Sequence, residues 1–408
     1  MTSMLLHNAT IIDCTGAEPR AHHSVLIERG RIDRIARADA ITPPDGAHVV
    51  DCGGLTLLPG LTDAHVHFGL TAEGPNPPPE SYVSYVLKVV ENIRIALDEG
   101  FTTVRDAGGL DPAYALAVEQ GQLVGPRILP SGSFITITGG HGDQRPRFVD
   151  EAPRSIAGLV AHSEVVDGPD AVRAAARRQI RRGATQVKLM VSGGVMSPND
   201  PLESTQFTVE EIAAAVHEAH AFGTYVLAHC HTVPAMNNAL AAGVRSIEHG
   251  SILDDATAAR MARDGAFLVP TMVILEILAR AERIPEFSRR KLELVRGETA
   301  RSLGIARSAG VSVGSGSDLL GPRQSRRASE IAFKAKHMGA MEALISATRT
   351  NAALFNMSER IGTLEEGKEA DIIAVEGDPL DDIECLVDAR NVRVVVQGGR
   401  IIKDTRGD

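Results

Sequence analysis

The sequence predicts an α/β protein: a (β/α)8 TIM barrel with a small composite β-sandwich built from both termini. Short β-like runs occupy both ends of the chain, and strand-like and helix-like segments alternate between them. Polar residues that can bind a metal close several of the inner strands. The length of 408 residues suits one barrel of roughly 250 residues with an accessory domain. We therefore expect residues 1–57 and 360–408 to form the sandwich and residues 58–359 to form the barrel.

Composition favours a soluble, cytoplasmic protein that acts on small molecules. The net charge of −10 argues against nucleic acid and a membrane surface as partners. No apolar run approaches the roughly 20 residues that cross a bilayer, and the amino terminus lacks the features of a signal peptide. The cysteines are scattered, and we expect free thiols in a reducing compartment at Cys14, Cys52, Cys230 and Cys385.

Both ends of the chain alternate β-like runs with turns. The expected strands cover residues 4–12, 24–28, 31–36 and 48–52 at the amino end, and 370–375, 392–396 and 400–403 at the carboxyl end. Neither end holds enough strands for a stable sheet alone. We therefore expect the two ends to pair with each other.

The central region alternates strands with helices, which favours a parallel sheet with crossover helices. The expected strands cover residues 55–61, 101–106, 126–131, 186–190, 225–229, 246–249, 267–271 and 313–318. The expected helices cover residues 81–97, 208–222, 286–309 and 330–355, the second opening with a capping-box spacing. Two long connections, 132–170 and 193–204, follow strand ends and should cover the barrel mouth as substrate loops.

Residues that can bind a metal stand where these strands end. His65 and His67 are two apart, so on a strand they point to the same side. On its own, this pair is as compatible with two hydrogen-bonded surface histidines as with a metal site. Later strand ends carry Lys188, His229, His249 and Asp318. Because the carboxyl ends of barrel strands meet at the active-site face, the ordered set favours a metal centre.

Lys188 needs a chemical change to belong to such a centre, because an ammonium has no lone pair to offer a metal. Reaction of its neutral amine with CO₂ gives a carbamate, which is a carboxylate in effect and can bridge two cations. A lysine paired with an acid or extended towards solvent is the alternative. The ordered set of neighbouring strand ends favours the carbamate.

Together these motifs resemble the amidohydrolase superfamily, specifically its imidazolonepropionase-like branch with metal-dependent Xaa-Pro dipeptidases (prolidases) and related carboxypeptidases. The likeness covers nearly the whole chain. It rests on the segments at residues 57–67, 138–142, 188–194, 228–229, 247–250, 316–318 and 362–373.

The resemblance implies a hydrolase with two divalent metal ions, Zn²⁺ first and Mn²⁺ or Co²⁺ as alternatives. One ion would be held by His65, His67 and Asp318, the second by His229 and His249, with carboxylated Lys188 bridging. A hydroxide between the ions would attack the amide carbonyl. Asp318 would accept its proton and pass it to the leaving amine.

The resemblance also implies substrate contacts. His141 would contact the substrate carbonyl, a loop-stabilising role being its alternative. His231 stands where close prolidase relatives have a tyrosine that contacts the substrate carboxylate, which leaves proline preference open. An imidazole is shorter than a tyrosine and can be cationic near neutral pH. The other interpretation is that His231 replaces His229 as a metal ligand.

We expect the substrate to be a dipeptide or an N-acyl amino acid with a free carboxylate. Arg323 could clamp that carboxylate with two hydrogen bonds, and Arg105 and Arg145 are weaker candidates. Hydrolysis of a cyclic or xenobiotic amide, imidazolonepropionase-like or lactamase-like, is the alternative. The strand-four lysine argues against a deaminase, and the filled ligand positions argue against a non-catalytic metal-binding protein. Relatives form homo-oligomers, which we also expect here.

Overall fold

The computed structural model describes residues 3–72, 81–150, 162–282, 284–322 and 324–407. Their contacts divide the chain into two units. Residues 1–63, 93–103 and 325–408 form the first unit, and residues 64–92 and 104–324 form the second. The domain limits expected at residues 57 and 360 stay a prediction.

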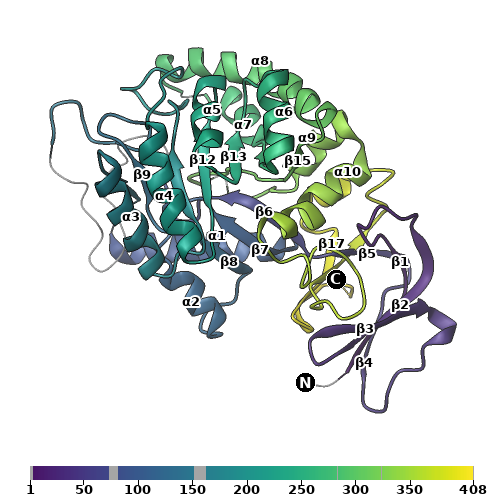
Figure 1. Ribbon diagram of the computed structural model, residues 1–408. Coiled ribbons are helices and arrows are strands. Elements are labelled where there is room, and N and C mark those ends of the chain that lie inside the picture. The colour runs from purple at the N-terminus through teal and green to yellow at the C-terminus, as the bar shows by residue number, and fades with distance from the viewer. Residues whose placement is uncertain (1–2, 73–80, 151–161, 283, 323, 408) are drawn as a thin grey trace. The chain divides into compact units, whose positions relative to one another are not determined.

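Strands from both chain ends pair in one sheet of eight strands (Figure 1). They are β1 (Met4–Ile11), β2 (Arg20–Glu28), β3 (Arg31–Arg37), β4 (His48–Asp51), β5 (Leu55–Pro59), β16 (Ile372–Glu376), β17 (Val392–Gln397) and β18 (Arg400–Asp404). The two ends meet where β16 runs antiparallel to β5, with Ala374 opposite Leu57. Buried apolar side chains of both ends, among them Leu6 and Val394, form one core. The two ends pair as expected, but they do so through β5, which we expected to belong to the first barrel strand at residues 55–61; the structure begins that strand at Leu61. Folding of this sheet into a two-layered sandwich stays a prediction.

Two further sheets carry the candidate site, and the strands of the larger one pair in parallel. The order β10-β9-β11-β12-β13-β14-β15 forms one sheet, and β6-β7-β8 forms another. Their bounds are β6 (Leu61–Val66), β7 (Phe101–Asp106), β8 (Arg127–Pro130), β9 (Phe134–Thr136), β10 (Ser163–Val165), β11 (Val187–Met190), β12 (Val226–Cys230), β13 (Ser246–His249), β14 (Phe267–Val269) and β15 (Ser312–Val313). The mixed α/β architecture is confirmed, and closure into a single barrel stays a prediction.

Helices alternate with these strands, as the sequence predicts. They are α1 (Tyr82–Asp98), α2 (Ala113–Glu119), α3 (Pro169–Arg181), α4 (Val209–Ala221), α5 (Val233–Ala241), α6 (Asp255–Asp264), α7 (Met272–Ala279) and α8 (Glu286–Ser308). The expected capping box of α4 is present: the Thr208 side chain accepts from the Glu211 backbone, and the Glu211 side chain accepts from the Thr208 backbone. Helices α3 to α6 lie along the parallel strands in Figure 1.

The helices expected over 330–355 are short in the structure. Helix α9 (Ser329–Met338) ends before Gly339, whose φ of 85° breaks the helix. Helix α10 (Ala340–Ile345), a π-helical turn (Ser346–Thr350) and α11 (Asn351–Leu354) follow.

Two expectations about the parallel strands need correction. The connection at 132–170 contains β9 and β10, which pair in parallel. Each has only three residues, too few for a visible alternation. The eighth strand is only Ser312–Val313, and an irregular segment carries the chain to Asp318. That segment runs beside β6, where a Cβ on Gly316 would lie 2.5 Å from the His65 Cβ.

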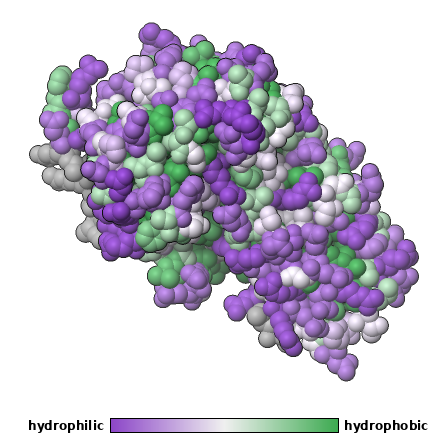
Figure 2. Space-filling view, in the orientation of Figure 1, coloured by the Kyte–Doolittle hydropathy of each residue, from purple (hydrophilic) through white to green (hydrophobic). Residues whose placement is uncertain are grey.

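The state of the cysteines and the character of the surface can be compared with what the composition predicts. All four cysteines are free, as expected. The face drawn in Figure 2 mixes hydrophilic and hydrophobic residues. Among the described residues, no helix combines the length and the apolar character needed to cross a bilayer.

Candidate metal centre

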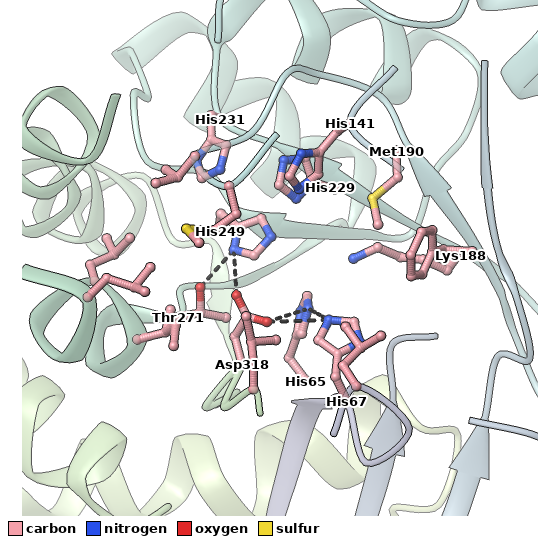
Figure 3. Close-up of a pocket in the computed structure, with 18 of the residues that line it drawn as sticks. His65, His67, His141, Lys188, Met190, His229, His231, His249, Thr271 and Asp318 are labelled. Atoms are coloured by element: carbon pink, nitrogen blue, oxygen red, sulfur yellow. Dashed lines mark hydrogen bonds and ion pairs between the residues drawn. The ribbon is translucent and has the colours of Figure 1, made fainter. Parts of the chain in front are cut away.

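The predicted site residues converge on one pocket of the second unit (Figure 3). They come from the ends of different strands and from the loops that follow them. The pocket is lined by His65, His67, His141, Lys188, His229, His231, His249 and Asp318, together with apolar side chains. Arg323 lies outside the described residues. The fold therefore brings together every predicted metal ligand, along with His141 and His231, whereas the weaker candidates Arg105 and Arg145 do not line the pocket.

His65, His67 and Asp318 offer three ligand atoms that lie within 4.8 Å of one another. The two Nε2 atoms are 3.2 Å apart, and Oδ1 of Asp318 is 3.3 Å from Nε2 of His67. Nδ1 of His67 donates to the Gly108 carbonyl at 2.7 Å, and Nδ1 of His65 donates to the Glu248 carboxylate at 2.6 Å. Neutral rings therefore direct two Nε2 lone pairs and a carboxylate at one point, which suits a divalent cation.

Protonation opposes metal binding at this cluster. Burial, followed by the charge of Lys188, lowers the pKa of His65 to about 4. Burial also works against a charge on His67, but the hydrogen bond and charge of Asp318 outweigh it and raise its pKa. A proton on His67 therefore competes with a metal ion, so that metal affinity should rise with pH.

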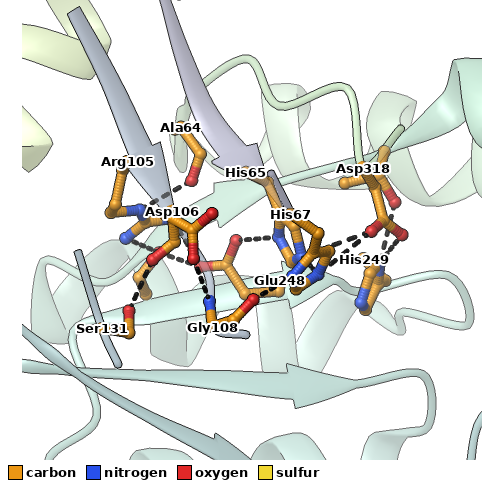
Figure 4. Close-up of polar contacts among 12 residues, drawn as sticks. Ala64, His65, His67, Arg105, Asp106, Gly108, Ser131, Glu248, His249 and Asp318 are labelled. Atoms are coloured by element: carbon orange, nitrogen blue, oxygen red, sulfur yellow. Dashed lines mark hydrogen bonds and ion pairs between the residues drawn. The ribbon is translucent and has the colours of Figure 1, made fainter. Parts of the chain in front are cut away.

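A buried acid–base pair holds His65 in place (Figure 4). The Oε1 of Glu248 accepts from Arg105 at 2.8 Å and from Ser246 at 2.5 Å, while Oε2 accepts from His65. Burial alone would raise the pKa of Glu248, but Arg105 and His65 lower it to about 2. An ionised Glu248 fixes the Nδ1–H tautomer of His65 and orients the ring towards the cluster.

The second cluster consists of His229, His231 and His249, whose ligand atoms also lie within 4.8 Å of one another. Nε2 of His229 donates to the Gly193 carbonyl at 3.2 Å, which leaves its Nδ1 lone pair available. Nδ1 of His249 contacts the Thr271 hydroxyl at 2.7 Å, and Nδ1 of His231 contacts the Ser251 hydroxyl at 2.9 Å. Both interpretations of His231, substrate contact and metal ligand, remain compatible with this geometry.

Burial keeps the second cluster neutral. It is the largest cause that lowers the pKa of His229 and His249 well below the usual value, and it lowers the pKa of His231 to about 3. This burial favours a neutral His231 near neutral pH. A substrate carboxylate could meet it through a hydrogen bond but not through a full charge.

Lys188 lies between the two clusters with its Nζ towards the pocket (Figure 3). Its side chain is buried, and none of the hydrogen bonds or ion pairs among the residues drawn in Figure 3 reaches it. Burial lowers its pKa to about 8, against the attraction of Glu248 and Asp318. Near neutral pH a small fraction of the amine is therefore uncharged and nucleophilic.

Apart from Gln144 and Thr271, the remaining pocket wall is apolar. Helix α7 follows β14 and contributes Ile274, Leu275 and Leu278, while the loop after β11 contributes Val195 and Met196. These side chains belong to one apolar cluster. Both long connections reach the pocket as expected, the first through His141 and the second through Val195 and Met196. Cys230 is buried and is not among the lining residues.

Comparison with known proteins agrees with these motifs: the amidohydrolase family matches residues 56–402. The chain belongs to this family. A solved prolidase in complex with N-methylphosphonate-L-proline is 38% identical, with a TM-score of 0.93 over 99% of this chain and 100% of that one. An ochratoxinase of Aspergillus niger is 32% identical over 372 residues, 85% of this chain and 75% of that protein. An imidazolonepropionase of Thermoplasma acidophilum is 24% identical over 412 residues, 95% and 90% of the two chains. The expected resemblance is confirmed.

Several supporting residues of this amidohydrolase were not predicted as such. Glu248 stands inside a predicted strand, where its charge at a buried position is the signal that could have found it. Arg105 is fully buried and pairs with Glu248, so it supports His65 instead of binding substrate. Arg145 pairs with Asp143 at 2.6 Å, which also indicates a structural role. Sequence spacing gives no sign of Thr271 or Ser251, because their contacts depend on tertiary packing.

Proposed function

We propose that this amidohydrolase cleaves the amide bond of a dipeptide or an N-acyl amino acid at a centre of two divalent metal ions, with Zn²⁺ the first choice. The observation that carries the proposal is the pair of imidazole clusters on either side of Lys188 in one pocket. His65, His67 and Asp318 would hold one ion, and His229 and His249 the other. The same strand ends are expected to close into one (β/α)8 barrel.

Lys188 would bridge the ions as a carbamate. Its buried Nζ faces the pocket without a hydrogen bond to the residues drawn in Figure 3, and a buried ammonium in that state is costly. The ammonium would lose one proton to become the neutral amine, and attack on CO₂ would form the N–C bond with release of a second proton, so that an anion suited to metal binding would replace the cation. The lowered pKa of Lys188 supports this reaction, since only the neutral amine attacks CO₂.

Bound divalent ions would polarise the scissile carbonyl and lower the pKa of a water molecule towards neutrality. The protein's own part in proton transfer would fall to Asp318. Burial would raise its pKa, but His65 and the hydrogen bond with His67 lower it, so that the carboxylate is ionised and can accept a proton. Asp318 would then deliver this proton to the nitrogen of the leaving amine. His141, on the pocket wall, would contact the substrate carbonyl.

The wall of α7 indicates an apolar group on the substrate. Ile274, Leu275 and Leu278 would remove from water a branched or aromatic side chain, at about 0.8 kcal/mol per buried CH₂. His231 would donate a hydrogen bond to the substrate carboxylate. The similar prolidase structure, with a proline derivative bound, supports a dipeptide substrate.

A second candidate is hydrolysis of a xenobiotic amide. It is favoured by the relative named ochratoxinase, whose name indicates a toxin as its substrate instead of a dipeptide. The apolar pocket wall suits either candidate, so the wall alone does not separate them.

The test is a substrate panel for the full-length protein, purified with Zn²⁺ or Mn²⁺ and with bicarbonate. It contains Xaa-Pro dipeptides, other dipeptides, N-acyl amino acids and cyclic amides, and follows the released amino acid. We expect turnover of dipeptides or N-acyl amino acids with apolar side chains. Turnover confined to cyclic or xenobiotic amides would replace the proposed substrate class, and no turnover of any amide would contradict the proposed function.

A further inference from the structure

Lys291 of α8 binds the loop after β11 from outside the pocket. Its ammonium donates to the backbone carbonyls of Gly194, Ser197 and Asp200 at 3.0, 2.8 and 2.5 Å. An ammonium has three N–H donors, so each donor has one carbonyl acceptor. The carboxylate of Asp200 lies 3.8 Å from the same nitrogen and adds an opposite charge. The loop is thus folded around a fixed cation.

The same loop contacts the His141 side chain and fixes its position. Ser197 Oγ lies 2.7 Å from Nδ1 of His141, and the ring packs so closely on Gly194 that a Cβ there would lie 2.2 Å from Cε1. Any displacement of the loop would therefore displace the imidazole. His141 in turn stacks on the ring of His229, with centroids 4.4 Å apart.

A second link ties the two substrate loops together. Gln206 accepts from the His141 backbone N–H at 2.7 Å and donates to the Asp200 carboxylate at 2.8 Å. Asp200 also accepts from the Gly194 backbone at 3.2 Å. The His141 backbone and side chain are therefore both held by groups whose positions depend on the loop around Lys291.

We propose that Lys291 is a positioning residue, which acts on the reaction through His141 by fixing the loop that carries Gly194, Ser197 and Asp200. The proposal rests on the proposed function in one respect, namely the substrate contact of His141. Ser197 can also determine which nitrogen of His141 carries the proton. When its hydroxyl donates along the shorter contact to Nδ1, the proton of neutral His141 is on Nε2, which can then donate to a carbonyl.

Lys291→Met keeps the apolar stem and removes the ammonium. We expect kcat to fall on the order of tenfold to a hundredfold, as for a displaced catalytic group, with unchanged metal content because no ligand is altered. The double variant with His141→Ala should be no slower than His141→Ala alone, since both changes remove the same interaction. Additive losses would contradict the proposal.

Lys403→Met is the matched control. Lys403 is also partly buried and donates to two backbone carbonyls, those of Asp98 and Ala389, at 3.0 and 2.8 Å. It belongs to the first unit, whereas the pocket lies in the second. We expect a comparable loss of thermal stability with full activity. A similar loss of kcat in Lys403→Met would show that general destabilisation explains the effect and would overturn the proposal.

Amide hydrogen exchange provides a readout that does not need turnover. In Lys291→Met, exchange should accelerate at residues 194–200 and 139–143 and remain unchanged in β12 and β13. Unchanged exchange at both loops would overturn the proposal even if activity fell. An inactive wild-type protein would contradict the proposed function, while exchange would still test Lys291.

If Lys291→Met does not fold, Ser197→Ala replaces it, with the same non-additivity expected against His141→Ala.

Discussion

The carboxylate of Glu248 lies 2.6 Å from Nδ1 of His65, and both side chains are buried. Because this contact fixes which nitrogen of His65 faces the pocket, Glu248→Gln should weaken metal binding at the first cluster by about 10- to 100-fold. Isothermal titration of the metal-free protein with Zn²⁺ measures the effect. Glu218→Gln makes the same change at a carboxylate that pairs with Arg177, and its affinity should match the wild type. Wild-type affinity in Glu248→Gln would contradict the role assigned to it.

Lys188→Ala tests the carbamate bridge. Without the shared ligand, we expect turnover to be abolished and metal content to fall to one ion or fewer per chain, measured by elemental analysis. Lys188→Arg keeps a cation but cannot form a carbamate, and should be as inactive as the alanine variant. Intact-protein mass spectrometry under bicarbonate should show the CO₂ adduct only in the wild type. A fully active Lys188→Ala would rule out the bridge.

His231 separates two roles that the geometry leaves open. If it binds substrate, His231→Ala should keep the full metal content and raise KM for substrates with a free carboxylate. His231→Tyr should shift preference towards proline, measured as the ratio of kcat/KM for Xaa-Pro and other dipeptides. Loss of metal from His231→Ala would instead make it a ligand of the second cluster. Unchanged metal and unchanged selectivity would exclude both roles.

The apolar wall predicts side-chain selectivity. Leu275→Ala should lower kcat/KM for substrates with leucine- or phenylalanine-sized groups by about tenfold or more, with little effect on small ones. Leu292→Ala is the control, because Leu292 belongs to the same apolar cluster but does not line the pocket. Each variant should lose about 2–5 kcal/mol of unfolding free energy. Equal selectivity in both variants would contradict a substrate contact by Leu275.

The buried ammonium of Lys334, which lies outside the pocket, should make the free energy of unfolding depend on pH. It is buried in the first unit, 2.6 Å from the Ser346 hydroxyl, and burial lowers its pKa to about 7. Between pH 7 and its ordinary pKa of about 10.4, the unfolded chain binds more protons than the folded one, so stability should rise with pH. Denaturant unfolding of Lys334→Met should lack this contribution, which is up to about 1.4 kcal/mol per pH unit. Identical pH slopes would contradict the shift.

Sequence spacing could predict the site because strand ends put distant residues on one face. His65, Lys188, His229 and His249 each lie on a strand whose β character is visible locally, and the order of the strands then brings them together. Asp318 was expected at the end of a strand over 313–318, but the strand before it covers only Ser312–Val313. Its backbone lies beside β6 through a hydrogen bond of 2.8 Å to the His65 carbonyl, a tertiary contact that spacing does not reveal.

The residues that hold the predicted metal ligands and His141 in position were harder to predict from the sequence. Arg105 could be a substrate clamp or a structural partner as long as its surroundings are unknown, and only the fold places it against Glu248. Likewise, Lys291 is one of many cationic residues on a long helix. Its proposed role depends on three backbone carbonyl groups in a loop about 90 residues earlier in the chain. No local sequence pattern indicates this contact.

Asp318 and His249 share a backbone feature, a left-handed conformation with φ of 53° and 69°. This limits how their chemistry can be probed. Asparagine tolerates such dihedrals better than most residues, whereas alanine or a β-branched residue would add conformational strain to the loss of the functional group. Asp318→Asn and His249→Asn are therefore the informative replacements, because a defect in either can be assigned to the missing carboxylate or imidazole.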